Sequence, residues 1–177
     1  MDKETVQKCE NGKDWNKVGI ISKMITDRQH YIVRVGDGKN FLASRENFWG
    51  FNKKEPGMKT RIKKLKNGDV LYFITSKKFG GNVIGIGEYT GTFYDREDEP
   101  LLLIHTKSNK EQGWDGDDEW KLQVHYRNLY LPKMIKINCI VSCASSLLSY
   151  RTFKDRINED LPLHWNMFKK YGTCFKN

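Results

Sequence analysis

Residues 61–87 read RIKKLKNGDVLYFITSKKFGGNVIGIG. The unbroken apolar run Val70–Ile74 is typical of a central strand that is covered on both faces. Gly80-Gly81-Asn82 is a hairpin signal, and residues 83–89 supply the partner strand, in which Gly85 and Gly87 allow a backbone or a ligand to come close. The stretch therefore predicts a β-hairpin at the centre of a β-rich fold.

Further strands are predicted on both sides of this hairpin. Residues 31–35 alternate with the period of a half-buried strand and end at a Gly-Asp-Gly turn, and residues 101–105, 122–126 and 135–141 read as strands as well. Residues 40–57 are aromatic but irregular, residues 58–66 have helical spacing, and residues 145–171 carry an apolar helical stripe. We expect an α+β fold, a curved mixed β-sheet or small barrel of about six strands, with short flanking helices and a C-terminal helix.

Length and composition fit one globular domain. The 177 residues suffice for a single core, so we assign 1–177 to one domain, with an N-terminal arm at 1–28 and a helical C-terminal extension at 145–177. Residues 1–15 lack the apolar segment of a signal peptide, and no run of apolar residues approaches the roughly 20 that are needed to span a bilayer. These observations predict an intracellular protein, cytoplasmic or nuclear, with no membrane partner.

The sequence favours binding over catalysis. Its four cysteines form no paired zinc-ligand spacing, so we expect reduced thiols and neither metal nor cofactor. It has no HExxH, P-loop or GxSxG motif. The acidic stretches 95–99 and 115–119 are interpreted as solvated loops on the face away from the partner. A formal charge of +9 favours a polyanionic partner, although a solvated lysine-rich surface would give the same value.

Several aromatic and polar residues are candidates for a base-binding pocket. Trp49 is the first candidate for stacking, because it lies in a glycine-containing segment followed by lysines; the alternative is a core residue that closes the end of the barrel. Hydroxyls and amides after strands can pair with base edges, although hairpin and turn formation are the alternatives. The predicted pocket comprises Phe48, Trp49, Phe51, Asn52, Thr75, Ser76, Trp114 and Tyr126. Trp120 is a further candidate, but a tryptophan that opens a strand is more often core.

A basic segment could hold the phosphates. Residues 53–66 are rich in Lys and Arg, and the hairpin adds two lysines. A solvated amphipathic helix is the alternative interpretation. The predicted phosphate-binding residues are Arg34, Lys53, Lys54, Lys59, Arg61, Lys63, Lys64, Lys77 and Lys78.

Residues 30–90 resemble the EVE domain of the PUA-like superfamily, to which the YTH readers of methylated adenine are related. The resemblance rests on a basic helix, Gly68-Asp69, an apolar strand followed by Ser76, and a return strand ending Ile84-Gly85-Ile86-Gly87. Residues 31–34 are similar to the family's opening strand, and residues 48–51 stand where the family has a Trp-Gly segment. The family's Asn-rich stretch is replaced here by residues 52–57. The resemblance implies a curved, barrel-like sheet with a pocket at one end for one flipped or modified base.

These observations lead to the hypothesis of a non-catalytic nucleic-acid-binding module. It would recognise one base of DNA or RNA, plain or modified, in an aromatic pocket, while a basic surface holds phosphates. The alternatives are a protein–protein interaction module, such as a viral antagonist of a cellular factor, and a small nucleotide-processing enzyme.

Overall fold

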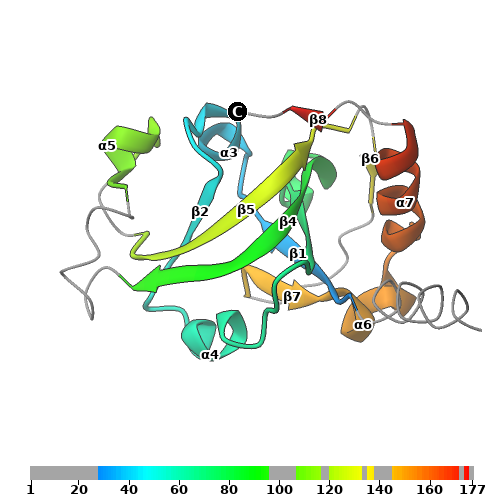
Figure 1. The fold of residues 1–177 in the computed structure, drawn as a ribbon, viewed down its shortest axis with the longest axis horizontal. Coiled ribbons are helices and arrows are strands. Elements are labelled where there is room, and N and C mark those ends of the chain that lie inside the picture. The colour runs from blue at the N-terminus through cyan, green and yellow to red at the C-terminus, as the bar shows by residue number, and fades with distance from the viewer. Residues whose placement is uncertain are drawn as a thin grey trace, which may run out of the picture.

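The computed structural model describes residues 28–95, 107–116, 120–132, 135–137, 145–171 and 174–175. The strands within these ranges are β1 (His30–Arg34), β2 (Phe48–Phe51), β3 (Val70–Ile74), β4 (Asn82–Asp95), β5 (Leu122–Tyr130), β6 (Ile135–Lys136), β7 (Leu147–Ser149) and β8 (Cys174–Phe175). The helices are α3 (Lys39–Ala43), α4 (Met58–Ile62), α5 (Asn109–Gln112), α6 (Tyr150–Phe153) and α7 (Leu161–Tyr171), with 3-10 turns η1 (Lys77–Phe79) and η3 (Lys154–Arg156). Helices α3 and α5 lie at the opposite end of the molecule from α6 and α7 (Figure 1).

The strands form one mixed sheet. Its order is β2-β5-β4-β3-β1-β7, with β6 paired to β4 and β8 paired to β5. β1 and β3 are parallel, with His30 opposite Val70 and Arg34 opposite Ile74, whereas the other pairs are antiparallel. The predicted α+β class, with a curved mixed sheet and short flanking helices, is confirmed. Over the described ranges the sheet is open and has eight strands, not about six.

The central hairpin is where the sequence placed it. All five residues of β3 are buried because each face of the sheet carries a core. Leu71 and Phe73 point into one cluster, with Trp49 and Met58, and Tyr72 points into the other, with Trp165. A continuous apolar run is the expected pattern for such a doubly covered strand.

Strand β4 gives the sheet its bend. It is 14 residues long, and its register with β5 shifts between Ile86 and Glu88 and again between Tyr89 and Phe93. Gly91 adopts a φ of +86°, a conformation that glycine tolerates best. Bulges of this kind twist and bend the strand that carries them, and β4 and β5 curve together across the molecule (Figure 1).

Two segments differ from the sequence-based expectations. Residues 48–51, predicted to be irregular, form β2, and all four are buried, so the polar alternation that marks a half-buried strand is missing. The predicted helical extension from residue 145 begins with β7, where Leu147 and Leu148 enter opposite core clusters and pair with β1. The stripe in residues 161–171 does form a helix, α7.

Several predictions concern residues outside the described ranges. They include the arm up to residue 27, the strand at 101–105, the acidic residues 96–99 and 117–119, and residues 138–141. The described ends of the two acidic stretches do not fit solvated loops that face away from the partner: Asp95 is 1% exposed in β4, and Asp115 lines the cavity described below. No side chain of the four cysteines is described. Among the helices of the described part, none has the length and apolar character needed to cross a membrane.

Candidate functional site

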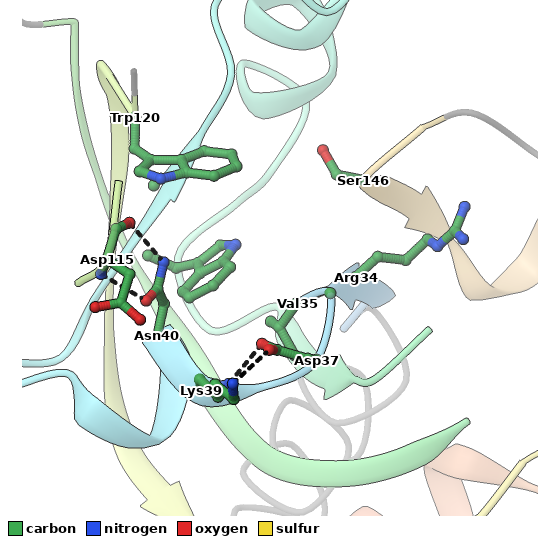
Figure 2. A pocket seen from close by; sticks show the side chains of 11 residues that line it. Arg34, Val35, Asp37, Lys39, Asn40, Asp115, Trp120 and Ser146 are labelled. Atoms are coloured by element: carbon green, nitrogen blue, oxygen red, sulfur yellow. Dashed lines mark hydrogen bonds and ion pairs between the residues drawn. The ribbon is translucent and has the colours of Figure 1, made fainter. Parts of the chain in front are cut away.

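A cavity of about 340 Å³ lies at the carboxyl end of β1. The end of β1 and the turn after it contribute Arg34, Val35, Gly36 and Asp37, and α3 contributes Lys39 and Asn40. The rest of the lining is Trp49, Gly50, Asp115, Trp120 and Ser146. Figure 2 shows Trp120, Asn40 and Asp115 on one side, with Arg34 and Ser146 on the other. The volume is within the range of about 300–1,000 Å³ that is usual for small-ligand sites.

Backbone hydrogen bonds fix the edge formed by β1. The amide of Arg34 donates to the carbonyl of Ser146 at 2.9 Å, and the amide of Val35 donates to the carbonyl of Ile74 at 3.0 Å. The amide of Ser76 donates to the carbonyl of Gly36 at 2.8 Å. Strands β3 and β7 therefore hold this edge from both sides.

Tryptophans form the apolar wall of the cavity. Trp49 is 7% exposed, and its ring centroid is 5.5 Å from that of Trp114. A Cβ on Gly50 would overlap the Cβ of Trp120 and come within 2.9 Å of Cζ3 of Trp114. Glycine at position 50 therefore lets the two other tryptophans close over β2.

Helix α3 holds the loop that carries Trp114. The side-chain amide of Asn40 donates to the carbonyl of Asp115 at 3.3 Å, while its Oδ1 accepts from the amide of Asp115 at 2.9 Å. The indole Nε1 of Trp114 donates to Oγ of Ser44 at 2.7 Å. Asn40 lies in α3 and Ser44 directly follows it, so the position of the tryptophan wall depends on the position of α3.

Charged groups of both signs surround the cavity. Asp37 accepts a hydrogen bond from the amide of Lys39 at 3.0 Å, and their charged groups lie 3.7 Å apart with the lysine 78% exposed. On the other side, Ser146 donates from its amide and hydroxyl to Glu55, which also pairs with Arg61 at 2.6 Å. The rim is therefore polar around an indole wall.

The structure places only part of the predicted pocket at this cavity. Trp49 and Arg34 line it, and Ser76 is bonded to its edge. Phe51, at 0% exposure, and Tyr126, at 4%, are core residues instead, because their side chains pack into the cluster on one face of the sheet. Burial also raises the pKa of the Tyr126 hydroxyl, as expected for a phenol removed from water.

Four other predicted pocket residues have structural roles. Phe48 packs against the ring of His125 at 3.7 Å between centroids. Asn52 accepts from the amide of Lys54 at 2.9 Å, which is the turn-forming alternative. Oγ1 of Thr75 accepts from the amide of Asn82 at 2.9 Å and so closes the hairpin. Trp114 supports Trp49 but is not among the residues that line the cavity.

Of the nine predicted phosphate-binding residues, Arg34 lines the cavity, and the other eight divide into two groups. Lys53 and Lys59 each pair with the carboxylate of Asp95, at 3.1 and 2.8 Å, and Arg61 pairs with Glu55, so these three cations are engaged in the fold. The remaining lysines are exposed: Lys54, Lys63, Lys64, Lys77 and Lys78.

Sequence reasoning missed most of the polar lining. Asp37, Lys39 and Asn40 follow a strand at a glycine-rich turn, and this signal could have singled them out. Trp120, a further candidate from the sequence, does line the cavity. Ser146 had no local signal, because a long-range strand pairing brings it to the cavity.

The arrangement suits binding of a flat ligand. An indole wall can stack on a planar ring, and the polar rim offers donors and acceptors to the edge of that ring. Among the residues that the structure describes, no three His, Cys, Asp or Glu side chains gather as metal ligands.

Comparisons with known proteins do not identify the chain. No protein-family model matches it, and no curated protein matches it. A solved structure titled as a hypothetical protein from Leishmania major is similar, with a TM-score of 0.46 and 12% identity over 82% of this chain and 96% of the other. That likeness is too remote to indicate a function.

Proposed function

We propose that this protein is a non-catalytic nucleic-acid-binding module that takes up one base of DNA or RNA, plain or modified, in the cavity at the end of β1. The observation that carries the proposal is the cavity lining, which combines two indoles, those of Trp49 and Trp120, with a polar rim. Aromatic rings stack on any base, at about 1–3 kcal/mol per base, and a buried base edge needs hydrogen-bonding partners. Three lining side chains keep hydrogen-bonding capacity for it: the carboxylate of Asp37, the second N–H of the Asn40 amide, and the hydroxyl oxygen of Ser146, whose proton goes to Glu55.

The charge of the protein fits the same partner. The chain carries a formal charge of +9, and Arg34 and Lys39 lie at the cavity itself. Phosphates that flank a bound base would find these cations within reach. The resemblance of residues 30–90 to EVE domains supports the proposal, and the proposal includes an intracellular location, cytoplasmic or nuclear.

The test is a fluorescence titration with short oligonucleotides. Single-stranded and duplex probes, plain or carrying one N6-methyladenine or 5-methylcytosine, are added at two salt concentrations. Binding should quench tryptophan emission and weaken with salt, with a slope of about −0.7 per phosphate contacted on a single strand. Trp49→Ala and Trp120→Ala should each weaken binding by roughly 5- to 150-fold, the equivalent of about 1–3 kcal/mol.

A matched control removes an aromatic ring elsewhere. Phe153→Ala deletes a half-buried ring of α6 that packs against the core cluster on the other side of the sheet, and it should leave affinity unchanged. Circular dichroism checks that each variant is folded. If both folded tryptophan variants bind as well as the wild type, the cavity is not the binding site.

One observation favours a second candidate, a protein-interaction module. Leu163 and Met167, one turn apart on α7, are 54% and 51% exposed. Exposed apolar side chains of this kind can anchor a protein partner. Binding through them would change little with salt, which distinguishes it from phosphate contact.

A further inference from the structure

The loop between β3 and β4, residues 76–81, presents an aromatic ring to solvent. Phe79 is 47% exposed, although phenylalanine is among the residues most often buried. Nζ of Lys78 lies 5.4 Å from the centre of its ring, within the distance of a cation–π contact. The ring is therefore an exposed aromatic surface with a cation over one face.

Internal hydrogen bonds hold this loop in shape. The amides of Phe79 and Gly81 both donate to the carbonyl of Ser76, at 2.8 and 3.1 Å. Oγ1 of Thr75 donates to the carbonyl of Phe79 at 3.2 Å and also accepts from the amide of Asn82. A loop backbone held in this way loses little conformational freedom when a ligand stacks on the Phe79 ring, which favours affinity.

The loop adjoins the cavity. The amide of Ser76 bonds to the carbonyl of Gly36, and Gly36 is part of the cavity lining. A Cβ at Gly38 would lie 3.2 Å from Cγ2 of Thr75, so the turn after β1 and the hairpin loop are packed together. One nucleic-acid strand could therefore reach both places.

The charge of the loop suits a phosphate backbone. Lys77 and Lys78 are exposed, and residues 75–87 contain no Asp or Glu. Lys39, at the rim of the cavity, is a third exposed lysine on the adjoining turn, where it pairs with Asp37. The surface from the cavity to Phe79 thus combines an aromatic face with positive charge, which is the usual combination in single-strand binding sites.

We propose that Phe79 stacks the nucleotide next to the base in the cavity, and that Lys77 and Lys78 contact the phosphate between the two. The partner is then a single strand, because a paired base offers no free face to a side chain outside the duplex stack. This inference rests on the proposed function and adds a second subsite to it. A nucleoside alone occupies the cavity, and an oligonucleotide occupies both subsites.

The test separates the two subsites. The probes are N6-methyladenosine monophosphate and single-stranded nonamers that carry N6-methyladenine, 5-methylcytosine or an unmodified base at the centre. 2-Aminopurine is placed on the 5′ or the 3′ side of that base, because its fluorescence is quenched by stacking. Phe79→Ala should lower nonamer affinity about tenfold and abolish the quenching at one of the two positions, whereas Phe79→Trp should restore both.

The controls match the type and exposure of the changed residues. Leu131→Ala removes an exposed apolar side chain just after β5, and Lys154→Ala removes an exposed lysine of η3; neither should alter affinity. Lys77→Ala combined with Lys78→Ala should reduce the salt dependence of nonamer binding by about one phosphate contact. Monophosphate binding should be the same in wild type and Phe79→Ala.

The outcomes distinguish the inference from the function on which it rests. Nonamer binding that needs Trp49 but is unchanged in affinity and quenching by Phe79→Ala overturns the second subsite and leaves the cavity proposal standing. Preference for duplex over single strand also overturns it. Absence of binding to every probe overturns both proposals.

Discussion

Asn40 and Asp115, 75 residues apart in the sequence, exchange two hydrogen bonds, one from the Asn40 side-chain amide and one to its carbonyl oxygen. The pair ties α3 to the loop that follows α5. Because Trp114 precedes Asp115 and packs on Trp49, this pair also controls the back of the cavity. Asn40 itself lines the cavity.

Asn40→Ala should loosen the tryptophan wall. The variant loses both bonds to Asp115, and because they lie at the surface we expect only about 1 kcal/mol of lost stability. The larger effect should be on the tryptophans, with emission shifted to the red and acrylamide quenching increased. Asn166→Ala, at an exposed position on α7, is the control. Unchanged quenching in Asn40→Ala would show that Asn40 does not hold this loop.

Gly50→Ala should push the wall apart. The added Cβ would overlap Cβ of Trp120 and crowd Trp114, and overpacking of this kind typically costs about 1–3 kcal/mol. Urea unfolding measures the loss, and oligonucleotide titration measures the binding. Gly87→Ala, where the Cβ would lie 3.0 Å from Cδ2 of Tyr126, tests whether destabilisation alone weakens binding. A Gly50→Ala protein with normal affinity would mean that the wall tolerates the displacement.

The central hairpin could be predicted from sequence because its signals are local. The apolar run of β3 and the Gly80-Gly81 turn need no knowledge of the rest of the chain, and both were confirmed. β2 and β7 could not be predicted in the same way. All four residues of β2 are buried, and β7 contains only two apolar residues, so neither strand shows the alternation that would predict it. Long-range pairing decides their structure.

The candidate site was predictable only in part for a related reason. Trp49 stood out by type and by its position beside glycine, but burial was not visible in the sequence. Phe51, Tyr126 and Trp49 all pack into the same core cluster, but among these three only Trp49 also lines the cavity. Gly85 and Gly87 were expected to allow a close approach, and the neighbours that come close are the protein's own Phe41 and Tyr126. Lys53 and Lys59 looked free because Asp95, their partner, is 42 and 36 residues away.

His30 should make the protein less stable in mild acid. Burial, with a smaller contribution from Arg28, lowers the pKa of His30 from 6.5 to about 4. Between these pH values the unfolded chain holds a proton that the folded protein does not, so stability is complete above pH 6.5 and falls as the pH drops toward 4. With allowance for its partial exposure, the loss should be about 2 kcal/mol.

The contacts of His30 suggest the variant that tests this. The hydroxyl of Tyr72 donates to the carbonyl of Leu161 at 2.8 Å, so Nδ1 of His30, also at 2.8 Å, is the donor to that hydroxyl. His30→Gln keeps a donor without a titrating group. Urea unfolding at pH 7 and pH 4.5 should show a smaller difference in the variant than in the wild type. An equal difference would assign the acid sensitivity to other groups.

Lys53 and Lys59 should matter for folding and not for nucleic-acid binding. Both pair with Asp95, whose side chain is 2% exposed. Either lysine alone still compensates the carboxylate, so we expect each single change to alanine to cost about 1 kcal/mol or less. The double variant removes both lysines from the buried carboxylate and should cost more than the two single changes together, up to about 3–5 kcal/mol in urea unfolding. The control variants Lys63→Ala and Lys64→Ala, at exposed positions, should each change stability by less than about 0.5 kcal/mol.

The salt dependence of oligonucleotide binding should be the same in wild type and in Lys53→Ala. A shallower dependence in that variant would place Lys53 on a phosphate after all.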